Sequence, residues 1–294
     1  MFENFTIFAT IKINIIKTEF IKFVLVFFLV GVSYALTAQE DIVVTVNGVS
    51  FVMKYVEGDR FVMGAQSFGR QWANFDSEAA GDETPPHYVT LSSFYMGETE
   101  VTQGLWEAVM GTTLEQQRDN ENPEWPLRGV GADYPMYYVS WDDCQAFVEK
   151  LSGLTGRIFR LPTEAEWEFA ARGGNKSKGD KYAGSKHMGL AGWYYMNSAS
   201  SSHPVKEKAA NELGLYDMSG NVWEWCSDWY GRYDRVLQTD PQGPDIGEER
   251  VLRGGGWAYY APRCRVSFRY KFNPEHSNSS YGFRIVMVAE TSKK

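Results

Sequence analysis

The sequence contains few of the side chains that bind transition metals. It has only three cysteines and four histidines, and no histidine takes part in an H-x-x-x-H or H-x-x-E spacing. A non-heme iron site needs two or three imidazoles, or imidazoles with a carboxylate, around open positions. His87 follows two prolines and is expected to shape a turn, whereas His187 and His203 lie in polar stretches typical of solvated loops. The sequence therefore gives no strong indication of an iron centre.

Positive charge is also scarce. The chain has 29 lysines and arginines against 37 aspartates and glutamates, which gives a formal net charge of −8. A nucleic-acid-binding surface needs clustered lysine and arginine. We therefore expect no nucleic acid partner.

The N-terminal apolar run is too short to cross a bilayer comfortably. Residues 23–32 are apolar, follow Lys12, Lys17 and Lys22, and precede a stretch of small residues. This order of charged, apolar and small segments is typical of a cleaved signal peptide. We expect residues 1–38 to be that signal peptide, with cleavage after Ala38 or Ala35, and an uncleaved anchor is the alternative. Residues 39–294 are then expected to form one exported domain, periplasmic, on the cell surface or secreted.

The rest of the chain predicts an α+β domain with low regular secondary structure. Asn47-Gly48 suits the two positive φ angles of a tight hairpin turn between strands within residues 42–56. Thr102, Ser140 and Thr163 are each placed to cap a helix, the last in a capping box with a glutamate three residues on. The three helices are expected over residues 103–109, 141–151 and 164–172, and further short strands over residues 61–64, 88–91 and 93–96. From residue 173 onward regular structure is hard to find.

An ordered set of motifs carries a family resemblance. The motifs are F-V-M-G at 61–64, E-T-P-P-H-Y-V at 83–89, E-T-E-V-T at 98–102, V-S-W-D-D at 139–143, R-L-P-T-E-A-E-W-E-F-A-A-R-G-G at 160–174, N-E-L-G-L-Y-D-M-S-G-N-V-W-E-W at 211–225, R-V-L-R-G-G at 250–255 and G-F-R at 282–284. The set resembles the formylglycine-generating enzyme family, or sulfatase-modifying factor domain, over roughly residues 52–288. The resemblance implies a variant of the C-type lectin fold, with small antiparallel sheets and long loops pinned by aromatic side chains and calcium.

The resemblance does not by itself fix an activity. The family includes copper-dependent oxidases that convert a sulfatase cysteine to formylglycine, iron-dependent sulfoxide-forming enzymes, non-catalytic secreted proteins, and the variable ligand-binding proteins of diversity-generating retroelements. In the oxidases two cysteines bind Cu(I), which prefers thiolate ligands. Their positions correspond here to Tyr259 and Cys264. Since tyrosine cannot replace a thiolate on Cu(I), Cys264 would be catalytic only in an oxidase with altered ligands, and copper is not expected.

Calcium is the cofactor that the resemblance favours. The family's calcium loop uses two side chains and two carbonyl groups, which is the oxygen-rich ligand set that Ca²⁺ prefers. Carried over, the ligands are Asp217, the carbonyls of Gly220 and Val222, and Glu224. The alternative is that Asp217 caps a turn and Glu224 binds Arg253 or another cation.

The cysteines allow two interpretations. Cys226 and Cys264 both lie in segments expected to pack at the centre of the fold. In an exported protein a bridge between them is plausible, with a stabilisation of about 3–4 kcal/mol. Two buried free thiols are the alternative, and Cys144 is expected to be buried and inert.

The segment R-G-G-G-W-A-Y-Y-A-P-R-C-R-V-S-F-R-Y-K-F, from Arg253 to Phe272, also has two interpretations. Alternation predicts a half-buried strand with Val266, Phe268, Tyr270 and Phe272 on its apolar face and Arg265, Ser267, Arg269 and Lys271 on the other. In the retroelement-diversified relatives, the corresponding positions vary and face the ligand. By this resemblance the ligand-binding residues would be Ala258, Tyr259, Tyr260, Arg263, Phe268, Tyr270, Phe272, His276 and Ser277, with Trp257 and Phe283 as scaffold.

The sequence therefore favours an exported, non-catalytic protein that binds a protein or glycan ligand through a C-terminal aromatic and arginine-bearing face. Aromatic and arginine side chains are what recognition surfaces favour. The first alternative is a formylglycine-generating oxidase or a related metal-dependent oxygenase. The second is a structural component of the cell envelope.

Overall fold

A computed structural model describes residues 39–71 and 74–289 of the chain. All helices and strands of the described part belong to one compact unit that begins at Glu40. The predicted signal peptide, residues 1–38, lies outside the described residues. Within residues 39–71 and 74–289, no helix combines the length and the apolar character that a membrane crossing needs.

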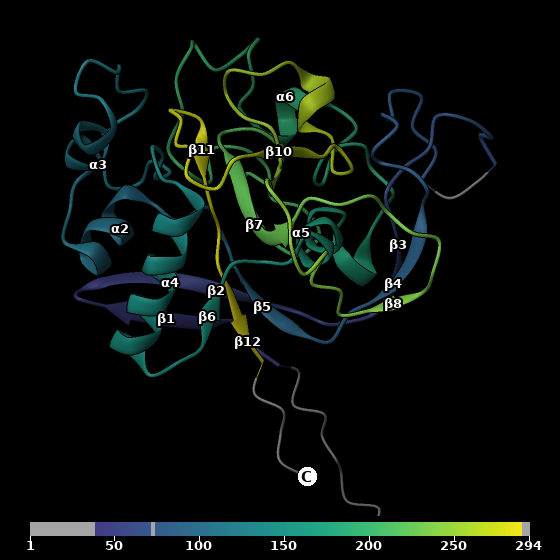
Figure 1. Cartoon of the computed structure of the whole chain (residues 1–294), viewed down its shortest axis with the longest axis horizontal. Helices are drawn as coiled ribbons and strands as arrows, with labels where there is room; N and C mark the ends of the chain where they lie inside the picture. Colours follow the sequence, from purple (N-terminus) through teal and green to yellow (C-terminus); the bar gives the residue numbers. More distant parts are fainter. Residues whose placement is uncertain (1–38, 72–73, 290–294) are drawn as a thin grey trace, which may run out of the picture. The chain divides into compact units, whose positions relative to one another are not determined.

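A five-stranded sheet joins the two ends of the described chain. Its strand order is β1-β2-β5-β12-β6, with β1 at Ile42–Val46, β2 at Val49–Val56, β5 at Phe94–Gly97, β12 at Val286–Val288 and β6 at Phe159–Arg160. The predicted hairpin is confirmed, because β1 and β2 are antiparallel and Asn47 and Gly48 both have positive φ. The C-terminal strand β12 lies between β5 and β6 and hydrogen-bonds to both, so β6 joins the sheet only through β12 (Figure 1).

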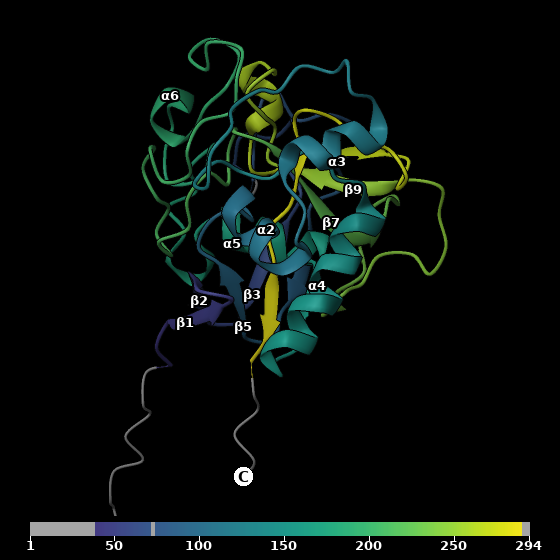
Figure 2. The same ribbon diagram turned by 90° about the vertical axis from the view of Figure 1, so that its left-hand side faces the viewer.

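Two of the predicted helices cover this sheet. They are α2 at Gln103–Met110 and α4 at Trp141–Thr155, which lie side by side in Figures 1 and 2. Their caps are those predicted, Thr102 and Ser140, and α4 continues past residue 151 until Gly156 ends it in a left-handed conformation. Trp106 of α2 stacks on Phe147 of α4 with 5.6 Å between ring centroids, and Phe283 packs edge-on against both. The predicted scaffold role of Phe283 is thus confirmed.

A four-stranded sheet forms in the region where little regular structure was expected. Its order is β10-β9-β7-β11, with β7 at Trp223–Trp229, β9 at Arg250–Arg253, β10 at Tyr270–Phe272 and β11 at Tyr281–Gly282. The first six residues of β7, W-E-W-C-S-D, are almost all buried, so this strand has no alternation of exposed and buried residues to reveal it. The third predicted helix, α5 at Glu164–Ala171, packs against β7 and β9.

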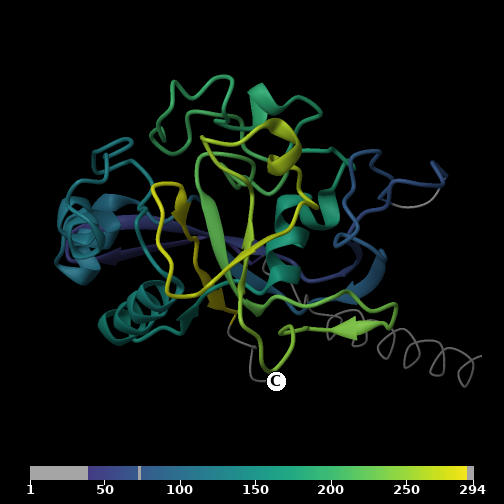
Figure 3. The ribbon, with the colours of Figure 1, turned by 45° about the horizontal axis from the view of Figure 1, so that its top comes forward.

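The remaining elements are short. A three-stranded sheet has the order β3-β4-β8, with β3 at Arg60–Met63, β4 at His87–Thr90 and β8 at Gln238–Thr239. Helix α3 at Leu114–Glu121 was not predicted, because it is mostly polar and lacks an apolar stripe. Helix α6 spans only Met188–Ala191. Figure 3 shows its loop beside the yellow 3₁₀ turn at Ala261–Cys264, which agrees with the packing of Met188 against Cys264.

Four buried arginines fix the C-terminal third in place, three of them by pairing with carboxylates from the rest of the chain. Arg253, Arg265, Arg269 and Arg284 are each at most 3% exposed. Arg265 binds Glu83 at 2.5 and 2.8 Å and Asp76 at 2.9 Å. Arg269 binds Glu164 at 2.6 and 2.7 Å, while Arg253 pairs with Glu168 and Arg284 with Glu224. Each pair therefore joins segments that are far apart in the sequence. We call these four pairs the arginine network.

The structure contradicts the predicted strand at residues 264–272, and the arginine network explains why. Residues Ala261–Cys264 form a 3₁₀ turn and only Tyr270–Phe272 is a strand. Arg265, Ser267 and Arg269, expected on the exposed face, are buried, whereas Phe268 and Tyr270 are only half-buried. The cause is charge pairing, since carboxylates of Glu83 and Glu164 draw the guanidinium groups inward. Lys271 is exposed and Val266 is buried, as predicted.

The three cysteines are separate buried thiols. Cys226 on β7 packs among residues of one apolar cluster, and Cys264 packs beside Tyr182 and Met188 in another. The predicted Cys226–Cys264 bridge is therefore not formed, and its alternative, two free thiols, is what the structure shows. Cys144 is buried in α4 as predicted. Burial raises the pKa of each thiol, to about 12 for Cys264.

The arginine network predicts a large cost for removing one cation. We expect Arg265→Met to lower the free energy of unfolding by about 3–5 kcal/mol, because Glu83 would keep a buried, unpaired charge. Urea unfolding measures the change. Lys271→Met is the matched control, since Lys271 and Glu249 form a solvent-exposed pair and should cost at most about 1 kcal/mol. Adding Glu83→Gln to Arg265→Met should restore part of the loss, and equal small losses in all variants would contradict the account.

The cysteine assignment predicts a thiol count. In the native protein, prepared without reductant, a thiol-specific reagent should label the cysteines far more slowly than it labels a free cysteine in solution, because all three are buried. In denaturant, still without reductant, all three should react. A single reactive thiol in denaturant would mean that a bridge exists after all.

Candidate ligand-binding face

The predicted ligand-binding residues gather around one buried ring, that of Trp223 on β7. Tyr259 meets this ring edge-on at 5.3 Å, Tyr270 stacks on it at 5.1 Å, and Phe268 lies at 6.0 Å, all between ring centroids. The three outer rings are half-buried, so each has one side on the core and another toward solvent. The indole nitrogen of Trp223 is buried and has no hydrogen-bond partner among the described residues. We call Trp223 and these rings the aromatic cluster.

Arginine and further aromatic rings extend the aromatic cluster at the surface. The exposed guanidinium of Arg263 lies 5.4 Å from the ring of Tyr259 and 5.9 Å from that of Tyr270, within reach of a cation–π attraction. Tyr260 is 59% exposed and its ring lies 4.6 Å from that of Tyr195. A backbone hydrogen bond of 2.9 Å from Tyr195 to the carbonyl of Tyr259 fixes the two segments side by side.

Phe272 and His276 continue the same face. Their rings are 4.3 Å apart, and partial burial lowers the pKa of His276. Tyr281 lies next to them, and its pKa is raised by burial and by the neighbouring hydroxyls of Tyr259 and Tyr270. Ala258 is exposed at the edge of the face, whereas Ser277 is buried with its hydroxyl unpartnered among the described residues. The structure therefore brings together all the predicted residues except Ser277.

The sequence did not identify two members of this face. Trp223 supplies its base, and Tyr195 adds to its rim beside Tyr260. Tyr195 lies in the sequence stretch W-Y-Y-M, within a loop that has no periodicity to place it. The aromatic side chains of that stretch in a polar region were the available signal. Trp257 is buried, as expected of scaffold, and its indole nitrogen donates to the carbonyl of Ser279 at 3.1 Å.

The residues at this face do not fit a copper centre. The Cys264 sulfur is fully buried, and its raised pKa keeps it a thiol at neutral pH. The other family ligand position holds the phenol of Tyr259. Cu(I) needs soft thiolate donors, and this pair of side chains does not supply them.

The predicted calcium ligands lie in a buried acidic group that also includes Glu100. One carboxylate oxygen of Asp217 accepts from the backbone of Lys206 at 2.9 Å, and the other is buried with no partner among the described residues. Burial raises the pKa of Asp217 to about 6, and burial and the neighbouring carboxylates of Asp217 and Glu224 raise that of Glu100 well above its usual range.

Arg284 is the cation of this group. It binds both carboxylate oxygens of Glu224, at 2.6 and 2.7 Å, and Trp167 donates to one of them at 2.6 Å. This agrees with the alternative assignment of Glu224 to a cation, though the cation is Arg284 and not Arg253. Three carboxylic acids and one guanidinium leave an excess of acid that a bound cation could balance. The unpartnered Asp217 oxygen fits an oxygen-coordinated ion such as calcium, whereas Glu224 would have to share its carboxylate between Arg284 and that ion.

Known proteins resemble this chain in sequence over most of its length. Residues 44–289 match the model of the sulfatase-modifying factor enzyme 1-like domain. The formylglycine-generating enzyme of Streptomyces coelicolor is 33% identical over 291 residues, which cover 79% of this chain and 88% of that enzyme. The chaperone protein LppX of Paenibacillus barcinonensis is 32% identical over 238 residues, which cover 67% of this chain and 81% of the relative.

Solved structures agree with the fold. Treponema denticola variable protein 1 superimposes with a TM-score of 0.71 and 32% sequence identity, covering 86% of this chain and 100% of that one. PvdO from Pseudomonas aeruginosa superimposes with a TM-score of 0.66 and 21% identity, covering 86% of this chain and all of that one. With the small curled sheets and few helices described above, the chain belongs to the sulfatase-modifying factor enzyme 1-like domain family and has the formylglycine-generating-enzyme-like variant of the C-type lectin fold.

Proposed function

We propose that this chain is an exported, non-catalytic binding protein that recognises a protein or glycan ligand through the aromatic cluster and its rim. The observation that carries the proposal is the half-exposed set of Tyr259, Phe268 and Tyr270 around Trp223, with Arg263 above it. Aromatic rings and arginine give large contact areas at low conformational cost. The loss of one thiolate position and the burial of Cys264 argue against the oxidase alternative.

Rigidity of the backbone beneath the face supports the same proposal. Arg265 and Arg269 anchor the segment on either side of Phe268 through paired carboxylates. The rings are thereby held in place before any ligand arrives, which reduces the ordering cost of binding. The relative from Treponema denticola is named a variable protein, and we propose that positions 258–277 are likewise the variable part of this chain. A near-identical template repeat in the neighbouring DNA would support retroelement diversification.

The ligand face predicts a separation of binding from stability. Tyr260→Ala and Arg263→Gln alter exposed side chains, so each should change the free energy of unfolding by less than about 0.5 kcal/mol. Both should weaken ligand binding about tenfold or more, because exposed aromatic and arginine side chains are the usual hot spots. Immobilised panels of purified glycans and cell-surface proteins, probed with the wild-type protein and both variants, measure this.

The matched control is Ile246→Ala, which alters a side chain that is exposed in a different loop. Its binding should equal that of the wild-type protein. The proposal fails if no member of either panel binds, or if protein loaded with Cu(I) converts the cysteine of a peptide to formylglycine in the presence of oxygen.

We further propose that calcium is bound by Asp217, the carbonyls of Gly220 and Val222, and a shared Glu224. The support is the unpartnered buried oxygen of Asp217 and the excess of carboxylic acids around Arg284. Bound calcium would supply positive charge and hold the loop that leads into β7, below the aromatic cluster.

The calcium proposal predicts a stabilisation that depends on Asp217. Calcium at about one hundred times its Kd should raise the free energy of unfolding by about 2.7 kcal/mol relative to protein in chelator. Asp217→Asn should remove this difference while keeping the backbone, because Asn tolerates the positive φ of 57° at this position. Asp245→Asn, in an exposed loop, serves as control and should keep the full effect. Identical melting curves of the wild-type protein in calcium and in chelator would refute the site.

A further inference from the structure

Three adjoining cavities surround the segment from Thr84 to Tyr88, at residues distinct from those of the ligand face. The first, about 470 Å³, lies between the start of α5, β8 and the loop after it. The second is about 480 Å³ and the third about 450 Å³. His87 lines the first and second, Thr84 and Pro85 line the second and third, and Arg232 and Tyr233 line the third and first. The three cavities therefore adjoin one another along this segment, and we call them together the groove.

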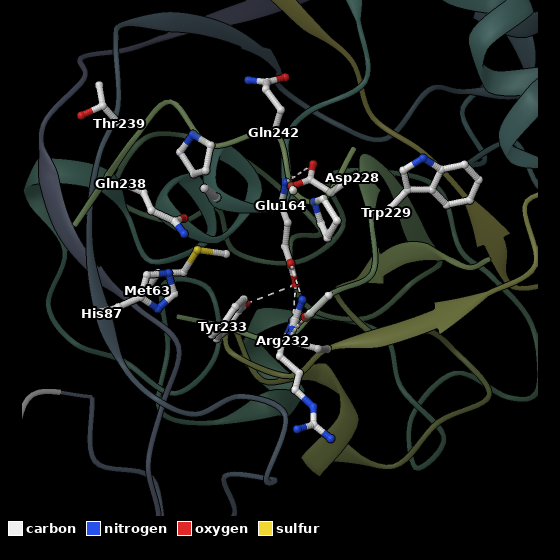
Figure 4. A pocket seen from close by; sticks show the side chains of 16 residues that line it. Met63, His87, Glu164, Asp228, Trp229, Arg232, Tyr233, Gln238, Thr239 and Gln242 are labelled. Carbon is white, nitrogen blue, oxygen red and sulfur yellow. Dashed lines mark hydrogen bonds and ion pairs between the residues drawn. The ribbon is translucent and has the colours of Figure 1, made fainter. Parts of the chain in front are cut away.

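The first cavity offers hydrogen-bonding groups without a fixed partner. Asp228 is only 4% exposed, and one of its oxygens accepts from the backbone of Glu164 at 2.9 Å and from Ser227 at 3.0 Å. Among the described residues, no group donates to its other oxygen. Figure 4 shows the carboxylate of Glu164 turned toward Tyr233, on the opposite side from that of Asp228. Glu164 is saturated by Arg269 and Tyr233, so Asp228 is the acid that remains open to a ligand.

Two glutamines and a threonine line the same cavity. Gln238 and Thr239 belong to β8, and Gln242 follows on the next turn (Figure 4). Amide and hydroxyl groups both donate and accept hydrogen bonds. Together with Asp228 they match the alternating N–H and C=O groups of an extended peptide, all of which need partners when removed from water.

The second cavity is apolar and has one cation. Val62, Phe68, Pro85, Pro86 and Tyr88 line it, and Arg235 stands at its edge. Phe68 is 65% exposed and Tyr88 is 57% exposed. This wall suits an apolar side chain, and such side chains exposed together mark interaction sites.

Two arginines of the groove are without counter-ions. Neither Arg232 nor Arg235 has an ion pair or a side-chain hydrogen bond with any residue of the described part. Asp82 lines the third cavity, but its carboxylate accepts from Tyr230 at 2.6 Å. In a chain with a formal net charge of −8, the free guanidinium of Arg235 in the apolar cavity and that of Arg232 in the two adjoining cavities favour a ligand that carries a carboxylate.

We propose that this groove binds an extended peptide segment of a partner protein, with an apolar side chain in the second cavity and an acidic side chain next to it on Arg235 or Arg232. The backbone of the peptide would meet Asp228, Gln238 and Gln242. A small rigid molecule would fill one cavity only, whereas an extended peptide is long enough to contact residues of all three adjoining cavities. This site is independent of the ligand face around Trp223.

Fluorescence anisotropy with labelled peptides tests the proposal on the purified protein. The probes are peptides of about nine residues, which span up to about 30 Å when extended. Their frame is serine, threonine and glycine, with a central leucine–glutamate pair, and matched probes carry leucine–glutamine, leucine–lysine or alanine–glutamate. We expect the leucine–glutamate probe to bind about tenfold more tightly than each matched probe.

Variants locate the binding. Arg232→Gln combined with Arg235→Gln should abolish the preference for glutamate over glutamine, and Gln238→Ala combined with Gln242→Ala should weaken all probes about equally. These side chains lie on the surface or the cavity wall, so folding should be unaffected, which circular dichroism checks. Arg263→Gln, which we expect to weaken binding at the ligand face, should leave the affinity for each peptide probe unchanged.

Absence of binding by every probe, or equal affinity for the glutamate and lysine probes, would overturn the proposal. So would loss of binding in Arg263→Gln with retention in the groove variants. That last result would place the peptide on the ligand face and support the proposed function instead, so the two proposals can fail separately.

Discussion

The fold depends on guanidinium groups buried against carboxylates. Arg253, Arg265, Arg269 and Arg284 all come from the C-terminal third, and their partners come from the loop before β4, from α5 and from β7. A buried charge without a partner is far more costly than a missing apolar contact, so placements of this segment that leave any of these arginines unpaired are disfavoured. Regular secondary structure is sparse around it, and the ion pairs supply the positional constraint that longer strands supply in other folds.

Presentation of the aromatic cluster follows from that constraint. Because Arg265 and Arg269 point inward, Phe268 and Tyr270 cannot both be fully buried, and they lie against Trp223 with one side open. The same placement seals Cys264 away from solvent beside Tyr182. At the two positions that the resemblance assigns to the thiolate pair of the oxidases, this chain carries a half-buried phenol, Tyr259, and a buried thiol, Cys264.

The sequence was sufficient where local chemistry decides the structure. The caps at Thr102, Ser140 and Thr163, the turn at Asn47-Gly48 and the scaffold role of Phe283 were predicted and are confirmed. It failed where distant partners decide. Alternation placed Arg265 and Arg269 on the exposed face, because a local pattern does not reveal their buried partners Glu83 and Glu164. Strand β7 was missed because a strand buried on both sides shows no alternation of polar and apolar residues. Most residues of the proposed ligand face could be named from the sequence, whereas Trp223 and Tyr195 could not, because only tertiary contacts bring them there.

The metal content of the purified protein tests most directly whether this face is a recognition surface or a redox centre. Protein expressed in the presence of calcium, copper and iron, and purified without chelator, should be measured by elemental analysis. If the chain is a binding protein with one calcium loop, we expect calcium near one ion per chain, because a buried oxygen of Asp217 has no other partner among the described residues. Copper and iron should lie well below that level. Copper or iron at one ion per chain would contradict the account and restore the enzyme alternative.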